Sequence, residues 1–125
     1  MNLSSRQVDP RDDIVVDERP WGRFEVLAHN KVSTVKIITV APGQRLSLQR
    51  HTHRDELWTI LDVELLVEVD GDRRLARPGD KVWIPRGGVH RIANPGHLAG
   101  RFVEVAFGNF DEDDIERLDD DYDRR

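Results

Sequence analysis

Three histidines stand in a pattern that favours a shared binding site. His51 and His53 are two residues apart, and on a β-strand such residues point to the same face. His90 lies in a second segment, GDKVWIPRGGVHRIAN, in which a short apolar strand and a Pro-Arg-Gly turn precede it. Imidazoles that converge from β-strands commonly hold a divalent transition metal or bind a polar ligand. A His-x-His pair alone also occurs by chance, so the prediction depends on both segments together.

Short apolar segments separated by turn residues predict the strands that position these side chains. Many short strands between Gly and Pro turns are typical of an all-β barrel or jelly roll. Asp70-Gly71 is a hairpin turn signal. Asp111 to Leu118 carries acids in its first turn and predicts one short helix. The expected strands are Phe24–Ala28, Val32–Val40, a long or broken Leu46–Leu61, Val63–Val69, Arg74–Ala76, Lys81–Ile84, Val89–Ala93 and Arg101–Phe107.

The composition limits the possible functions. The chain has 125 residues, most simply one domain, and no cysteine, which excludes disulfides and thiolate metal sites. Its net charge of −5 comes from an acidic end, since residues 108–125 hold nine acids against three arginines. We therefore expect no nucleic-acid partner. No stretch resembles a signal peptide or could span a bilayer, so we expect no membrane partner and a cytoplasmic location.

Two motifs resemble those of the cupin superfamily, and residues 19–125 resemble the C-terminal isomerase domain of type II phosphomannose isomerases. The resemblance lies in Arg19-Pro20-Trp21-Gly22, in LSLQxHxHRxE from Leu46 to Glu56, and in the closing EDDI from Glu112. It implies a cupin double-stranded β-helix, which is a jelly-roll barrel, with a short C-terminal helix. The implied parts are a flexible N-terminal arm (1–18), the cupin barrel (19–110) and an acidic C-terminal helix and tail (111–125). It also implies a homodimer.

The implied reaction is the interconversion of mannose 6-phosphate and fructose 6-phosphate through an enediolate, with a sugar phosphate as the small-molecule partner. The resemblance implies a divalent metal (zinc, manganese or cobalt) at His51, His53 and His90. Leu57 replaces a histidine of the family pattern, and Asp55 could substitute for it. The alternative function is that of a cupin that binds a sugar or another small polar ligand without turnover.

An isomerase needs a base at the reacting carbon, an electrophile at the oxygens and cations for the phosphate. The catalytic candidates are Lys36, Glu56, His90 and Glu104. Glu56 faces away from the histidines on a regular strand and reaches them only if the strand is bulged. Lys36 could instead be the ion-pair partner of Glu104.

Four polar side chains are the candidates for binding the substrate: Gln49, Arg54, Arg91 and Arg124. Gln49 shares the face of His51, and arginine matches the geometry of a phosphate. Strict alternation would point Arg54 and Arg91 outward, to the surface or to a dimer contact. Arg124 would have to fold back over the barrel mouth, and the alternative is a frayed terminus. Trp58 is either a core residue or a platform on which a sugar stacks.

Overall fold

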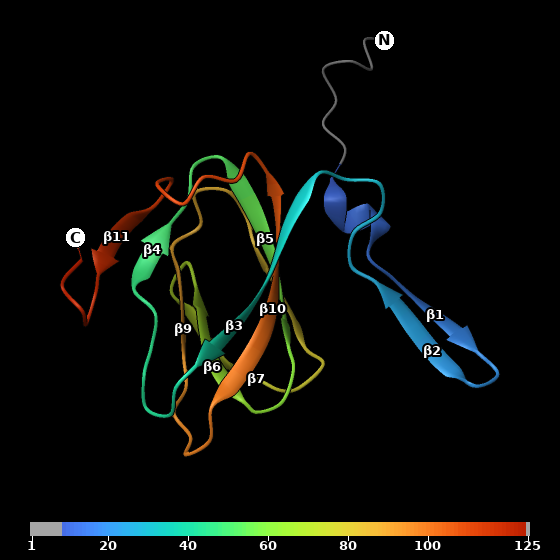
Figure 1. Ribbon diagram of the computed structural model, residues 1–125, viewed down its shortest axis with the longest axis horizontal. Coiled ribbons are helices and arrows are strands. Elements are labelled where there is room, and N and C mark those ends of the chain that lie inside the picture. The colour runs from blue at the N-terminus through green and yellow to red at the C-terminus, as the bar shows by residue number, and fades with distance from the viewer. Residues whose placement is uncertain (1–8, 125) are drawn as a thin grey trace, which may run out of the picture. The chain divides into compact units, whose positions relative to one another are not determined.

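The computed structural model describes residues 9–124, and these form two compact units that divide between Val32 and Ser33. In the first unit, a 3-10 turn, η2 (Pro10–Asp13), precedes a hairpin of β1 (Val15–Arg19) and β2 (Gly22–Val26) (Figure 1). The flexible arm was predicted to reach residue 18, and its first eight residues lie outside the described range. The described part of the arm holds the 3-10 turn and β1, in which the β-branched Val15 and Val16 favour the extended backbone that pairs with β2. The flexibility of the arm stays a prediction.

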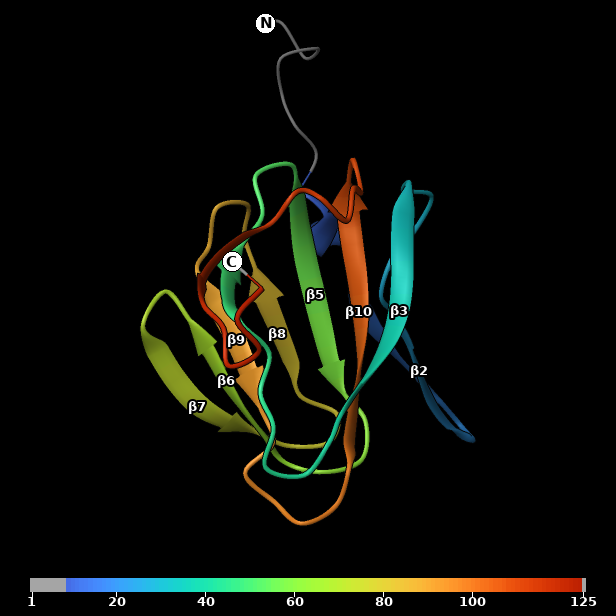
Figure 2. The same ribbon diagram turned by 60° about the vertical axis from the view of Figure 1, so that its left-hand side comes forward.

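The second unit consists of two antiparallel sheets that face each other (Figure 2). The order of the first sheet is β3-β10-β5-β8, and that of the second is β11-β4-β9-β6-β7. The strands are β3 (Ser33–Val40), β4 (Leu48–Arg50), β5 (Arg54–Ile60), β6 (Leu65–Val69), β7 (Asp72–Ala76), β8 (Lys81–Ile84), β9 (His90–Ala93), β10 (Gly100–Gly108) and β11 (Glu116–Asp119). This arrangement confirms the predicted all-β jelly-roll fold.

The core fills the space between the two sheets. Alternation along the strands turns one face inward, as in β6, where Leu65 and Val67 are buried. Burying one such side chain contributes about 1.5–3 kcal/mol. The cluster comprises Val40, Trp58, Ile60, Leu65, Val67, Ala76, Val82, Ile84, Ile92 and Phe102. Trp58 packs edge-on against His90 and contacts Phe102, so it is a core residue and offers no exposed face on which a sugar could stack.

The hairpin between β6 and β7 turns at Asp70-Gly71, as predicted. Both residues have a positive φ, 49° and 84°. Two-residue hairpin loops of this type need a left-handed backbone at both positions, which Asp tolerates and Gly favours. The Asp70 carboxylate also accepts a hydrogen bond from the Val89 amide at 2.9 Å, which ties this turn to the start of β9.

The expected long strand Leu46–Leu61 is broken. β4 ends at Arg50, a bend covers Thr52 and His53, and β5 begins at Arg54. The bend changes which residues face inward, so alternation counted from His51 does not continue into β5. Within β5, the side chains of Arg54, Glu56 and Trp58 contact one another on the inner face.

The predicted C-terminal helix at Asp111–Leu118 is wrong. The chain makes a tight turn and then forms β11, which pairs with β4. The acids that suggested a helix start serve the turn instead: Asp111 Oδ1 accepts a hydrogen bond from the Asp113 amide at 2.9 Å. Within residues 9–124, none of the helical segments has the length and apolar composition of a membrane span.

Candidate functional site

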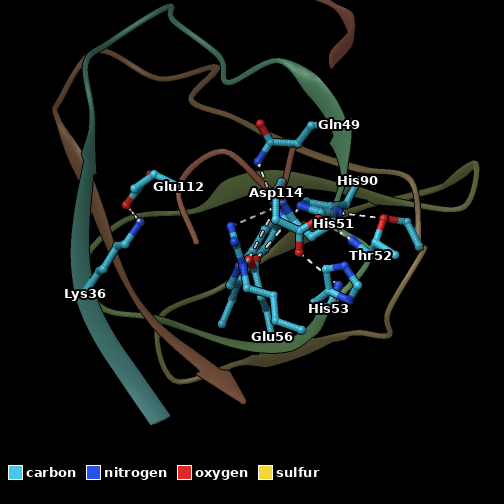
Figure 3. A network of polar contacts seen from close by, with 12 residues as sticks. Lys36, Gln49, His51, Thr52, His53, Glu56, His90, Glu112 and Asp114 are labelled. Carbon is cyan, nitrogen blue, oxygen red and sulfur yellow. Dashed lines mark hydrogen bonds and ion pairs between the residues drawn. The ribbon is translucent and has the colours of Figure 1, made fainter. Parts of the chain in front are cut away.

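His51, Glu56 and His90 form a buried cluster between the two sheets (Figure 3). The bend after β4 supplies His51, β5 supplies Glu56 and β9 supplies His90. His51 Nε2 lies 3.3 Å from Glu56 Oε2, and His90 Nε2 lies 3.9 Å from Glu56 Oε1. One ligand atom from each of the three residues lies within 4.8 Å of the others. This spacing allows all three to reach one ion.

Backbone carbonyls set the orientation of both imidazoles. His51 Nδ1 lies 2.7 Å from the Asp114 carbonyl oxygen, and His90 Nδ1 lies 2.8 Å from that of Gly88. A carbonyl only accepts hydrogen bonds, so each Nδ1 carries the proton and each Nε2 presents its lone pair. Burial lowers the pKa of both imidazoles, which favours the neutral form that a metal requires.

The donor set fits a divalent transition metal. Two imidazole nitrogens and one carboxylate are ligands that zinc, manganese and cobalt accept. His90 Nε2 is buried and has no hydrogen-bond partner within residues 9–124, an arrangement that is costly unless a ligand uses it. His51 Nε2 accepts a hydrogen bond from Arg54 Nη2 at 3.2 Å, so an ion would displace this guanidinium from the imidazole.

The two buried glutamates hold different charges. Burial tends to raise the pKa of Glu56, but the charge that His90 carries when it is protonated and a 2.9 Å hydrogen bond from Arg54 Nε outweigh it, and the pKa is lowered. Trp58 Nε1 donates a further hydrogen bond to Glu56 at 3.1 Å. Burial and the nearby Glu56 raise the pKa of Glu104 to about 8. At neutral pH, Glu56 is therefore the carboxylate and Glu104 the carboxylic acid.

The structure separates His53 from the other two histidines. His53 is exposed in the bend, and its amide donates to Asp114 Oδ2 at 2.9 Å. The predicted metal set of His51, His53 and His90 therefore needs correction: the bend ends the strand alternation that would have aligned the first two. Glu56 takes the third place, although the sequence placed it on this face only if the strand was bulged.

Leu57 is buried on the opposite face of β5, in register with Trp83 and Val105. A histidine at this position would therefore not point toward the cluster. Asp55 shares that orientation, and its carboxylate accepts a hydrogen bond from the Arg86 amide at 2.8 Å. Neither position supplies a ligand to the three-residue cluster.

A cavity of about 170 Å³ opens beside the cluster. Its lining is mostly polar and comes from both sheets and the C-terminal segment: Lys36, Ile38, Leu46, Ser47, Gln49, His51, Arg54, Glu104, Glu112, Ile115, Arg117 and Arg124. The structure thus brings several of the predicted site residues to one place. Gln49 lies there because its Oε1 accepts from Ser47 at 2.6 Å and its Nε2 lies 3.5 Å from His51 Nε2.

The predicted basic residues have separate positions. Arg54 points inward and is buried, contrary to the outward direction that alternation suggested, because the bend shifts the inner face. Lys36 forms an ion pair with Glu112 at 2.9 Å rather than with Glu104. Arg124 folds back and pairs with Asp120 at 2.8 Å.

Arg91 lies outside the cavity, and its guanidinium donates to Leu46 O at 2.9 Å and to Asp119 Oδ2 at 3.0 Å. Residue 91 follows His90 on β9, so its side chain leaves the opposite face of the strand. Arg91 therefore lies apart from the other candidates for substrate binding and lines a different cavity with Arg45 and Arg73. Its role in binding the substrate stays a prediction.

Sequence reasoning missed the roles of Asp114 and Arg117. Asp114 accepts from the amides of Thr52 and His53 and so holds the bend that positions His51. Arg117 lines the cavity from β11. Both lie in the segment predicted as a helix, so their contacts with residues more than sixty positions earlier had no local signal.

Two curated relatives show what this chain is similar to. It is 43% identical over 107 residues to the alginate biosynthesis protein AlgA of Pseudomonas aeruginosa. It is 38% identical over 107 residues to the mannose-1-phosphate guanylyltransferase of Escherichia coli. In both cases the match covers 85% of this chain and 22% of the relative. The chain therefore spans about a fifth of the length of these relatives.

These names overturn the expected reaction. The sequence predicted the interconversion of mannose 6-phosphate and fructose 6-phosphate, yet the relatives are guanylyltransferases and polysaccharide biosynthesis proteins. The assignment of this chain as a phosphomannose isomerase is therefore wrong. The motifs that suggested it identify a domain type, and that domain occurs within proteins named for a different reaction.

A solved structure and a family match agree on the domain type. A sugar phosphate isomerase of the cupin superfamily from Silicibacter pomeroyi has a TM-score of 0.55 at 26% identity, over 62% of this chain and 51% of that one. The predicted cupin fold is thus confirmed. The family described as "Mannose-6-phosphate isomerase C-terminal" matches residues 11–120. The chain belongs to this family of cupin domains.

Proposed function

We propose that this chain binds a mannose phosphate in the cavity beside a divalent metal held by His51, Glu56 and His90. The observation that carries the proposal is the buried, unpartnered Nε2 of His90, which faces Glu56 and lies beside His51. The bound metal would polarise an oxygen of the sugar. The name of the Escherichia coli relative supports mannose 1-phosphate as the first ligand to test.

The residues around the metal cluster have the properties that a sugar phosphate needs. Gln49 and Ser47 offer amide and hydroxyl groups to sugar hydroxyls. Lys36, Arg54, Arg117 and Arg124 supply positive charge for a phosphate. The proposal concerns binding and does not extend to guanylyl transfer, because the chain matches only 22% of the relatives' length.

Calorimetric titration of the chelated protein tests the metal part of the proposal. Zinc, manganese or cobalt should bind, and His90→Gln should weaken the metal affinity by more than about 100-fold, since even indirect partners of metal ligands contribute roughly 10–100-fold. His53→Gln is the matched control, because His53 is exposed in the bend and lies outside the cluster. Equal metal affinity of both variants would contradict the assigned ligand set.

The sugar part is tested by titrating mannose 1-phosphate into the metal-loaded protein, with mannose as the comparison. We expect binding of the phosphorylated sugar and much weaker binding of mannose, because the cavity offers cations that a neutral sugar cannot use. Equal affinity for the two sugars would refute the proposed phosphate recognition.

A further inference from the structure

The segment Phe110–Ile115, here called the strap, runs from the end of β10 toward β11 (Figure 1), and its residues Glu112 and Ile115 line the cavity. It contacts the site at both ends. The Phe110 ring lies under Lys36 Nζ and the Arg54 guanidinium, each 4.4 Å from its centroid. The Asp114 carbonyl oxygen accepts from His51 Nδ1 at 2.7 Å. The strap therefore belongs to the same site as the metal cluster.

The four cations of the cavity differ in their partners. Arg54 is committed to buried Glu56, and Arg124 to Asp120. Arg117 Nε is buried without a hydrogen-bond partner, and its guanidinium makes no ion pair within residues 9–124. Arg117 as a whole is half-buried, but a buried N–H without an acceptor is unfavourable, so its Nε marks a place where a hydrogen-bond acceptor is missing.

Lys36 has a partner of a different kind. Its ion pair is with Glu112 of the strap, at 2.9 Å, and the Glu112 side chain is 74% exposed. Ion pairs with so much exposure are weak and readily exchange partners. The Glu112 carboxylate thus pairs with the Lys36 ammonium group from the solvent side. It can dissociate from Lys36 without leaving a buried carboxylate unpaired, because Glu112 is mostly exposed.

We propose that Lys36 and Arg117 form the phosphate subsite of the cavity, and that Glu112 is an internal anion that holds this subsite until a phosphate displaces it. The inference rests on the proposed function for the identity of the ligand as a sugar phosphate. The planar guanidinium of Arg117 suits two phosphate oxygens, and Lys36 adds a point charge. Binding then releases Glu112 to solvent, so the strap makes phosphate affinity depend on a competing carboxylate of the same chain.

Titration of the full chain with inorganic phosphate tests this competition. Glu112→Gln keeps the size of the side chain and removes its charge, so phosphate should bind about two- to fivefold more tightly, which is the range of an exposed ion pair. Glu116→Gln is the matched control, because this neighbouring acid pairs with Arg50 at 2.7 Å and does not line the cavity. Its phosphate affinity should equal that of the wild type.

Arg117→Gln should lower phosphate affinity at least about tenfold, since a hydrogen-bonded charge is lost. Unchanged affinity in Glu112→Gln, or wild-type affinity in a folded Arg117→Gln protein, would overturn the inference. Glu112→Gln keeps the test decisive if the arginine variant does not fold.

The same titrations separate the failure of this inference from that of the proposed function. Binding of mannose 1-phosphate and metal with no effect of the two variants would overturn the subsite alone. A second outcome separates them the other way: phosphate affinity changes in the two variants as predicted, but the protein binds no metal and does not prefer mannose 1-phosphate over inorganic phosphate. This outcome would support the subsite and refute the proposed function.

Discussion

Glu56 and Glu104 share one buried environment, yet only one of them carries a charge. Glu56 receives the guanidinium of Arg54 and the indole N–H of Trp58, which stabilise its ionised form. Burial disfavours a charge on Glu104, and the neighbouring Glu56 carboxylate would repel one, so the pKa of Glu104 is raised to about 8. The interior thus contains one compensated ion pair and one neutral acid.

This difference predicts unequal effects of two matched substitutions on stability. Glu56→Gln leaves the buried Arg54 without its anion and should lower the free energy of unfolding by about 3 kcal/mol. Glu104→Gln replaces a neutral acid with a neutral amide of the same shape and should change it by less than about 1 kcal/mol. Urea unfolding of the chelated proteins at pH 7 measures both. A large loss in Glu104→Gln would show that Glu104 is ionised in the folded protein.

The sequence offered His51 and His90 as ligands, but it offered Glu56 as their partner only on condition that the strand was bulged. The His-x-His spacing predicted a common face for His51 and His53, which holds only on a continuous strand. The bend at Thr52 and His53 interrupts the strand, and it is held by Asp114, which lies about sixty residues later. No local pattern reveals such a contact, so strict alternation turned Glu56 away from the histidines, and only a bulged strand would have brought it to them.

At the scale of elements, the turn that ends at Asp114 determines the geometry of the site. Its carboxylate accepts from the amides of Thr52 and His53, each at 2.9 Å, and its carbonyl oxygen orients His51. The acids of this segment are typical of a helix start, which explains the helix prediction. A short isolated helix is only marginally stable in water. The backbone after this turn instead forms its hydrogen bonds with β4, as strand β11.

Asp114→Ala should therefore weaken metal binding although Asp114 is not a predicted ligand. Without its carboxylate, the two amides of the bend lose their acceptor and His51 becomes less well positioned, so we expect a 10–100-fold loss of zinc affinity. The free energy of unfolding should fall by about 1 kcal/mol. Calorimetry and urea unfolding measure these effects. Asp113→Ala is the control, and an equal loss in that variant would point to a general effect of charge.

The turn after β11 should respond to acid. Arg124 donates to Asp120 through its side chain and its amide, which holds the pKa of that carboxyl well below its usual range. A lowered pKa in the folded state stabilises the turn above the ordinary pKa of about 3.9, and this contribution is lost progressively as the pH falls below that value. Amide exchange at Arg124 between pH 6 and pH 2 should accelerate beyond the intrinsic trend. Asp120→Asn should abolish this pH dependence, and an identical profile in the variant would contradict the ion pair.

At the scale of the whole molecule, the sequence predicted most individual strands, but it did not predict which strands pair with one another. Alternation and turn residues predicted most strands of the jelly roll, because inward positions such as Leu65 and Val67 recur every second residue. The strand order was accessible only through the resemblance, since β10 lies between β3 and β5, which precede it by many residues. The predicted bounds of the barrel, residues 19–110, differ from those of the second unit at both ends. Residue 19 lies in the first hairpin, and β11, which belongs to the second sheet, follows residue 110.

The homodimer that the resemblance implied stays a prediction, and β3 is the surface on which to test it. β3 is an edge strand, and its Val35 and Ile37 side chains are both 61% exposed. Exposed apolar residues on an edge strand favour pairing with a second copy about a two-fold axis. Ile37→Glu should raise the dimer dissociation constant at least about 30-fold, as measured by light scattering over a concentration series. Leu75→Glu is the control, because Leu75 lies on β7, the exposed edge strand of the other sheet, and it should leave the dissociation constant unchanged. A monomeric wild type, or a dimer that dissociates in Leu75→Glu and not in Ile37→Glu, would show that β3 is not the interface.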